Sequence, residues 1–238
     1  MNIEALAGKS NAYFVSQGQD RYERVATVHP QSLVPTITIS HQTGSGTHEI
    51  AERLAQNLQK SEYKGTRPWA VYDQQLIEQA LEENRWPKEL AEKITEEKRL
   101  FIDELMDDLF NLRPPSWVFV PQVVETMLRL VMAGHAILVG HGATIATAKM
   151  SNVFHMRLTS SLARRIERVQ NLRNLTPEAA AKFVGKEDRG RARFVKSHFH
   201  ARLDNELLYD LAVNTDRVSI DDAVAVIVEG ARRFFSVL

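Results

Sequence analysis

Two stretches of the chain carry residues suited to binding phosphate, and the first is a glycine turn. It reads His41-Gln42-Thr43-Gly44-Ser45-Gly46-Thr47-His48 and lies between a β-branched segment and a segment with helical periodicity. In such a turn the backbone N–H groups point into a concave nest, and the following helix N-terminus favours an anion. The common loop G-x-x-x-x-G-K-[ST] is not matched, because this chain has His41 at the position of the first glycine and Thr47 at the position of the lysine. Two interpretations stay open, a phosphate site and a plain β–α turn.

The second stretch is the arginine-rich segment KEDRGRARFVK at residues 186–196. Guanidinium groups match phosphate oxygens bidentately and spread the charge that develops when a phosphoryl group is transferred. The alternative is a solvated basic face of a helix. The presence of a glycine turn and an arginine cluster in one α/β chain favours the phosphate interpretation.

The elements that would position these stretches follow from the hydrophobic periodicity. Short runs rich in β-branched or apolar residues predict five strands, and segments with helical spacing lie between them. The predicted strands are 34–40, 69–72, 136–139, 153–158 and 209–214. Thr176-Pro177 and Ser219 predict the starts of two helices as N-caps. Strands alternating with helices predict the α/β class, with a parallel sheet covered on both faces. We expect residues 1–33 to form an N-terminal extension and residues 34–238 to form one domain.

Composition excludes several classes of protein. The 238 residues contain 30 basic and 30 acidic side chains and no cysteine, which excludes disulfides, a cysteine nucleophile and a uniformly basic nucleic-acid coat. The charge is nevertheless uneven: residues 72–110 hold 5 basic against 12 acidic residues, and residues 157–202 hold 12 basic against 4 acidic. The chain shows neither a signal-like start nor an apolar run of about 18–20 residues, so we expect a cytoplasmic protein without membrane or nucleic-acid partners.

Six segments in this order resemble the cytidylate-kinase-like family, a branch of the P-loop nucleoside monophosphate kinases. They read ITISHQTGSGTHEIAERLA, VYDQQLIEQAL, ILVGHGATIAT, VFHMRLTSSLARRIERV, KEDRGRARFVK and YDLAVNTDRVSIDDAV. The resemblance covers about residues 34–236. It implies a three-layer αβα P-loop NTPase fold with a helical monophosphate-binding insertion at about 74–118 and an arginine-rich lid at about 185–200.

The resemblance also implies roles for individual residues, which fall into three groups. The phosphate loop that holds the nucleotide would be Gly44, Ser45, Gly46, Thr47 and His48. The acceptor monophosphate would lie against Tyr72, Asp73, Gly140, His141 and Gly142. The residues that contact the transferring phosphates would be Arg164, Arg168, Asp188, Arg189, Arg191 and Arg193. We predict no residue that binds a metal directly, because His198 and His200 at i,i+2 on a helix point to different faces.

Two departures from the family pattern concern catalysis. The loop lysine is replaced by Thr47, and His141 stands where the family usually has an arginine. The resemblance implies ATP with Mg²⁺ as donor and a nucleoside monophosphate such as (d)CMP as acceptor. The departures keep open a catalytically impaired nucleotide-binding sensor or interaction protein with the same fold. A kinase for another small phosphate acceptor is a third hypothesis.

Overall fold

A five-stranded parallel sheet forms the centre of the molecule. The computed structural model describes residues 34–61, 68–73, 106 and 119–236. The strands are β1 (Thr36–His41), β2 (Ala70–Tyr72), β3 (Ala136–Val139), β4 (Val153–Thr159) and β5 (Leu211–Asn214). Their order in the sheet is β2-β3-β1-β4-β5, and every neighbouring pair is parallel. Strand 136–139 is fully buried, as its continuous apolar run predicts for a sheet with both faces covered.

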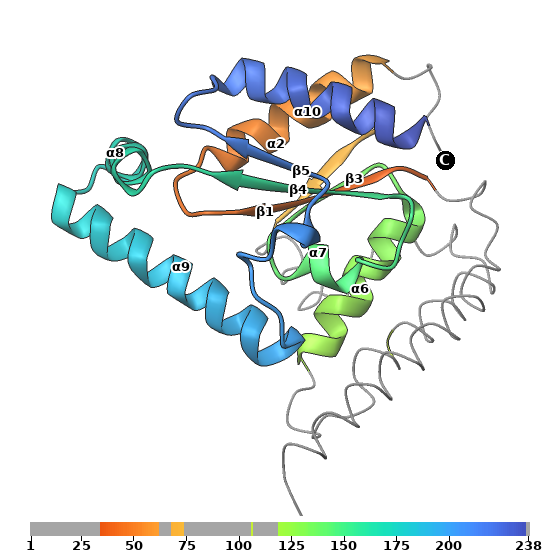
Figure 1. Ribbon diagram of the computed structural model, residues 1–238, viewed down its shortest axis with the longest axis horizontal. Coiled ribbons are helices and arrows are strands. Elements are labelled where there is room, and N and C mark those ends of the chain that lie inside the picture. Colours follow the sequence, from red (N-terminus) through yellow and green to blue (C-terminus); the bar gives the residue numbers. More distant parts are fainter. Residues whose placement is uncertain (1–33, 62–67, 74–105, 107–118, 237–238) are drawn as a thin grey trace, which may run out of the picture.

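Helices cover both faces of this sheet, which gives three layers (Figure 1). Two helices lie on one face, α2 (Thr47–Ser61) and α10 (Ile220–Phe235), and two on the other, α6 (Phe119–Ala133) and α7 (Ala143–Ala146). Side chains alternate along each strand, so Ile37 and Ile39 pack with the core of α2 and α10. Leu138 packs instead with the core of α6 and α7. The predicted α/β class with a parallel sheet is confirmed.

The carboxyl ends of β1, β3 and β4 lie together at one edge of the sheet. Strand β1 is central, with Ile39 opposite Val139 on one side and His41 opposite Leu158 on the other. After β1 the chain continues to β2 and β3 on one side of it, and later to β4 and β5 on the other. Such a switch point leaves a crevice outside the strand ends, where ligands bind in open α/β sheets. The glycine turn that follows β1 therefore lies where a ligand is expected.

Two further helices and a short 3₁₀ turn lie between β4 and β5. They are α8 (Leu162–Arg173), α9 (Pro177–Phe199) and η3 (Glu206–Leu208), and α9 runs past the carboxyl ends of the strands (Figure 1). Thr176 caps α9 by accepting a hydrogen bond from the Ala179 N–H (3.3 Å), and Ser219 caps α10 by accepting one from the Asp222 N–H (3.1 Å). Both predicted N-caps are confirmed.

The arginine-rich segment belongs to α9, which continues through it without a break. The sequence predicts a helix that starts at residue 177, and the resemblance implies a separate lid at about 185–200. In the structure, residues 185–199 are instead the second half of one 23-residue helix. Helix α7 has only four residues, too few for periodicity to reveal, and was not predicted. The predicted extension 1–33 and almost all of the predicted insertion 74–118 lie outside the described residues.

Candidate functional site

The loop between β1 and α2 has the backbone of an anion cradle. Gly44 and Gly46 both have positive φ, 83° and 86°, a conformation that side chains with a Cβ disfavour. A Cβ atom on Gly44 would lie 2.5 Å from the carbonyl oxygen of Arg165, so α8 packs directly against the loop. The Ser45 N–H donates to the Gln42 carbonyl (3.1 Å), and the Ile50 N–H donates to the Gly46 carbonyl (3.1 Å) to begin α2. The glycines thus permit both the turn and the close approach of α8.

Asp188 ties α9 to this loop. Its Oδ1 accepts hydrogen bonds from the N–H (2.9 Å) and the hydroxyl (2.8 Å) of Thr43, and its Oδ2 accepts from Arg165 (2.5 Å). Arg191 completes the set with an ion pair at 3.1 Å. Burial alone would raise the pKa of Asp188, but the Thr43 donors and the Arg165 guanidinium outweigh it and hold that pKa below its usual value. The carboxylate is therefore charged and holds α9 against the phosphate loop.

Two arginines of α8 reach the loop, and only one of them was predicted. Arg168 donates to the Thr215 carbonyl (2.7 Å), to the Thr215 hydroxyl (2.9 Å) and to the Gly44 carbonyl (3.4 Å). Arg165 is buried and, besides binding Asp188, donates to the carbonyls of Ser160 (3.1 Å) and Thr43 (3.3 Å). Residues three apart lie on one face of a helix, which brings Arg165 and Arg168 together.

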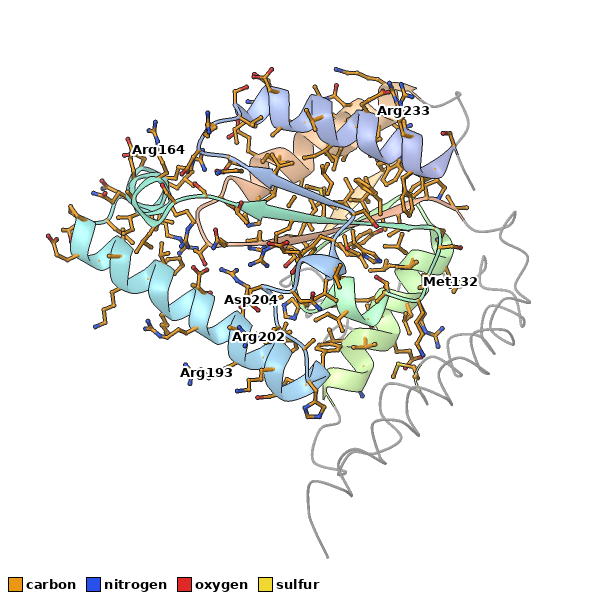
Figure 2. The ribbon with its side chains drawn as sticks, in the orientation of Figure 1. Met132, Arg164, Arg193, Arg202, Asp204 and Arg233 are labelled. Atoms are coloured by element: carbon orange, nitrogen blue, oxygen red, sulfur yellow. The ribbon has the colours of Figure 1, made fainter. Side chains whose placement is uncertain are left out.

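Arg164, which the resemblance places among the phosphate contacts, lies elsewhere. Its side chain is 60% exposed and pairs with Glu167 at 3.1 Å, and Figure 2 shows it directed outward from α8. Arg189 is likewise exposed, and it lines neither of the cavities described below. Arg165 was missed, although it stands one helical turn before the buried Val169 and so has the inward phase of α8.

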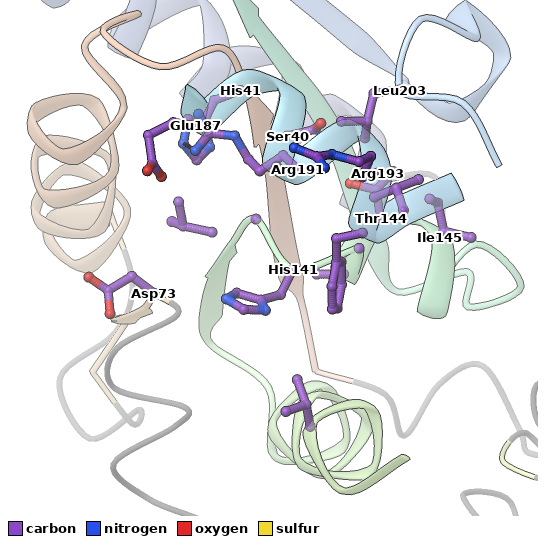
Figure 3. A pocket seen from close by; sticks show the side chains of 18 of the residues that line it. Ser40, His41, Asp73, His141, Thr144, Ile145, Glu187, Arg191, Arg193 and Leu203 are labelled. Carbon is purple, nitrogen blue, oxygen red and sulfur yellow. Dashed lines mark hydrogen bonds between the residues drawn. The ribbon is translucent and has the colours of Figure 1, made fainter. Parts of the chain in front are cut away.

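A cavity of about 700 Å³ lies between the loop, the carboxyl end of β3, α7 and α9. This volume is typical of small-molecule sites. The predicted residues that the structure brings to it include His48 of the loop, Asp73 after β2, Gly140, His141 and Gly142 after β3, and Arg191 and Arg193 of α9. Figure 3 shows Asp73 and His141 together with Arg191 and Arg193 around this space. Apolar side chains, among them Val123, Ile145 and Phe194, complete the wall.

His41 is held neutral at the edge of this cavity. The guanidinium Nη1 of Arg191 lies 3.0 Å from its Nε2, and because arginine only donates, His41 Nε2 accepts and its proton is on Nδ1. Burial, followed by the positive charge of Arg191, lowers the pKa of His41 to about 3. At neutral pH His41 therefore acts as a hydrogen-bond acceptor that orients Arg191 rather than as a cation.

We expect the stability of the protein to fall as the pH is lowered from about 6.5 toward 3, partly because of His41. The unfolded chain binds a proton there near pH 6.5, whereas the folded chain binds it only near pH 3. Each pH unit in this window costs about 1.4 kcal/mol. His41→Asn should make the dependence shallower, measured by urea unfolding at pH 6.5, 5.5 and 4.5. Asparagine tolerates the positive φ of His41 (54°), and His200→Asn, at an exposed site with φ 52°, is the matched control. If the free energy of unfolding falls equally steeply with pH in both variants, His41 does not cause the pH dependence.

The chain belongs to the cytidylate kinase-like family, whose sequence model matches residues 36–217. Among solved structures it is similar to an uncharacterized protein from Eubacterium ventriosum, with 14% identity over 84% of this chain and 98% of that chain and a TM-score of 0.56. It also matches a shikimate kinase from Bacteroides thetaiotaomicron, with 14% identity over 82% of this chain and 96% of that chain and a TM-score of 0.44. No curated protein matches. Among the residues described, no helix has the length and apolarity needed to cross a membrane.

Proposed function

We propose that the protein binds a nucleoside triphosphate at the phosphate loop and transfers its terminal phosphoryl group to a nucleoside monophosphate such as (d)CMP. The observation that carries this proposal is the glycine loop at the switch point of the sheet, which opens beside an arginine-lined cavity. Membership of the cytidylate kinase-like family supports the same chemistry. An oxygen of the acceptor phosphate would attack the γ-phosphorus while the bond to the β-phosphate oxygen breaks, and the nucleoside diphosphate leaves.

In this proposal, each group of residues has a separate task. Gly44, Gly46, Thr47 and His48 would hold the donor phosphates with backbone N–H groups, and Ser45, whose N–H donates to the Gln42 carbonyl, would keep the loop in its turn. Tyr72, Asp73, Gly140, His141 and Gly142 would hold the acceptor. Arg191 and Arg193, which line the cavity, would neutralise the transferring group, and Arg168 would hold the loop through Gly44. Catalysis would rest on positioning and charge, because phosphoryl transfer requires no covalent intermediate.

The cavity also fits the metal that such donors carry. Mg²⁺ prefers oxygen ligands and usually takes one or two carboxylates besides phosphates and water. No direct metal ligand was predicted from the sequence, but the structure brings the carboxylates of Asp73 and Glu187 to this cavity, and they would be the protein ligands. When bound, the ion would neutralise part of the phosphate charge.

A second candidate function, a nucleotide-binding sensor, is favoured by one observation. Thr47 occupies the position of the loop lysine, is 6% exposed and has its hydroxyl 3.0 Å from that of Ser45. The loop itself therefore offers no fixed positive charge to the terminal phosphate. Loss of one transition-state donor typically costs about 10²–10³ in rate. A chain that binds ATP tightly but turns it over slowly would satisfy this geometry.

Release of ADP in a coupled assay over the common monophosphates separates the two functions. We expect turnover with one monophosphate. We also expect kcat to fall by about 10² in Arg191→Ala, because the Arg191 guanidinium lines the cavity and is held there by His41. Lys182→Ala, which removes an exposed charge from the same helix outside the cavity, is the matched control. Thermal stabilisation by ATP without any turnover would favour the sensor. If millimolar ATP and GTP both leave the melting temperature unchanged, nucleotide binding itself is refuted.

A further inference from the structure

A second cavity, of about 460 Å³, adjoins the first along α9. It shares His41, Arg191 and Leu203 with the first cavity, so the two spaces have a common wall. Its other walls come from the carboxyl end of β4, from the last part of α9 and from the segment that leads to η3. The proposed phosphoryl transfer does not use these residues beyond Asp188 and Arg191.

The walls of this second cavity carry more positive than negative charge. They present four cationic side chains, Arg157, Arg191, Lys196 and Arg202, against the carboxylates of Asp188 and Asp204. Both carboxylates are already bound. Asp204 accepts two bonds from Arg202 (2.9 and 2.6 Å), and Figure 2 shows this pair on the segment beside α9. Asp188 holds Arg165, Arg191 and Thr43. The cationic side chains without a hydrogen-bonded carboxylate are therefore Arg157, which Asp204 also attracts through charge, and Lys196.

Arg157 is hydrogen-bonded by neutral groups, and the Asp204 carboxylate acts on it only through charge. Its Nη1 donates to the Ser40 hydroxyl (2.6 Å) and lies 3.4 Å from the Tyr209 hydroxyl, and its guanidinium carbon is 5.5 Å from the centre of the Tyr209 ring. Tyr209 is itself fixed by donating to the Leu203 carbonyl (2.9 Å). Within the part of the chain that the structure describes, no carboxylate bonds Arg157, and its Nε and Nη2 have no partner.

This pair of donors has the geometry that an oxyanion needs. The Nε–H and one Nη2–H of a guanidinium point in parallel and bind two oxygens of one phosphate. Lys196 adds a flexible point charge to the same cavity, and it forms no ion pair among the described residues. Half-burial of Arg157 lowers the local dielectric, which strengthens attraction to an anion.

We infer that the second cavity is a phosphate site, in which Arg157 and Lys196 bind a tetrahedral phosphate group. The group has two possible sources, free inorganic phosphate or a phosphate of a nucleotide that extends across the shared wall of His41 and Arg191. The site goes beyond the proposed function, because it requires neither the phosphate loop nor phosphoryl transfer.

The test measures thermal stabilisation of the full chain by inorganic phosphate at constant ionic strength, with sodium chloride as the balancing salt. We expect phosphate to raise the melting temperature, and the double variant Arg157→Gln/Lys196→Gln to weaken phosphate binding at least about tenfold. Lys182→Gln, an exposed change on the same helix outside both cavities, should bind as the unaltered chain does. Arg157→Lys in the otherwise unaltered chain should bind more weakly than the original but more tightly than the double variant, because it keeps the charge and loses the paired donors.

Competition then identifies the source of the phosphate. Shifts that add when phosphate and ATP are present together indicate a separate ion, whereas displacement of phosphate by nucleotide indicates a group of the nucleotide. The inference is overturned if phosphate gives no shift beyond chloride, or if the double variant, folded by circular dichroism, keeps the full phosphate shift. A failure of ATP to stabilise the protein would refute the proposed function and leave the phosphate result intact.

Discussion

Replacing Arg165 with methionine is expected to destabilise the protein by about 3 kcal/mol, because the change breaks a buried ion pair. The Arg165 side chain is 8% exposed, and its partner Asp188 is 29% exposed. Removing one member of a buried pair typically costs about 3–5 kcal/mol, since the other charge is left without its partner. We expect the lower end of this energy range, because Asp188 would still have its ion pair with Arg191 at 3.1 Å and the two hydrogen bonds from Thr43. For a chain of this size, we expect the melting temperature to fall by about 6–12 °C.

The matched control is the neighbouring residue, Arg164→Met. This side chain is 60% exposed, and exposed pairs between residues three or four apart contribute about 0.3–0.5 kcal/mol. Calorimetry or urea unfolding of the two variants should therefore separate them by more than about 2 kcal/mol. Equal destabilisation would show that the ion pair between α8 and α9 has no special role in stability.

The same substitution should loosen α9 from the phosphate loop. Arg165 donates to the Thr43 carbonyl while Asp188 accepts from the Thr43 N–H, so the two side chains together bind both polar groups of one loop peptide segment. Hydrogen exchange of the Thr43 amide should be faster in Arg165→Met than in Arg164→Met.

The sheet was predictable from the sequence, because its strands are short runs rich in β-branched or apolar residues. Strand 136–139 is predicted with the bounds that the structure shows, and strand 153–158 is one residue shorter than the observed one. The parallel arrangement follows from the alternation with helices. Helix α7 could not be predicted, because four residues are too few to show a period.

The candidate site was predictable in position but not in detail. The glycine turn and the arginine cluster indicated where phosphate could bind, and the structure places both beside one cavity. The helical phase of Val169 favours Arg165 over Arg164, whereas the resemblance placed Arg164 in the site; which groups Arg165 binds depends on how α8 packs against the loop. The role of Arg157 depends on contacts with Ser40 and Tyr209, more than fifty residues away along the chain, which no local pattern reveals.

Gly44→Ala and Gly190→Ala are chemically identical substitutions for which we expect opposite effects on stability. Gly44 has φ +83°, and an added Cβ would lie 2.5 Å from the Arg165 carbonyl oxygen and 3.0 Å from the Arg165 Cα, so backbone must move. Such strained positions cost about 1–3 kcal/mol each. Gly190 lies inside α9 with nothing within 4 Å of an added Cβ, and alanine there should stabilise the helix by about 0.5–1 kcal/mol.

The Gly44 variant should also lose the stabilisation that nucleotide provides, because a displaced loop no longer presents its N–H groups to phosphate. Stabilisation by a ligand grows as RT ln(1 + [L]/Kd), so a hundredfold excess over Kd is worth about 2.7 kcal/mol in the unaltered chain. Melting curves of both variants with and without millimolar ATP give the comparison, and circular dichroism verifies that Gly44→Ala is folded. A folded Gly44→Ala protein with an undiminished ATP shift would place the donor phosphates somewhere other than this loop.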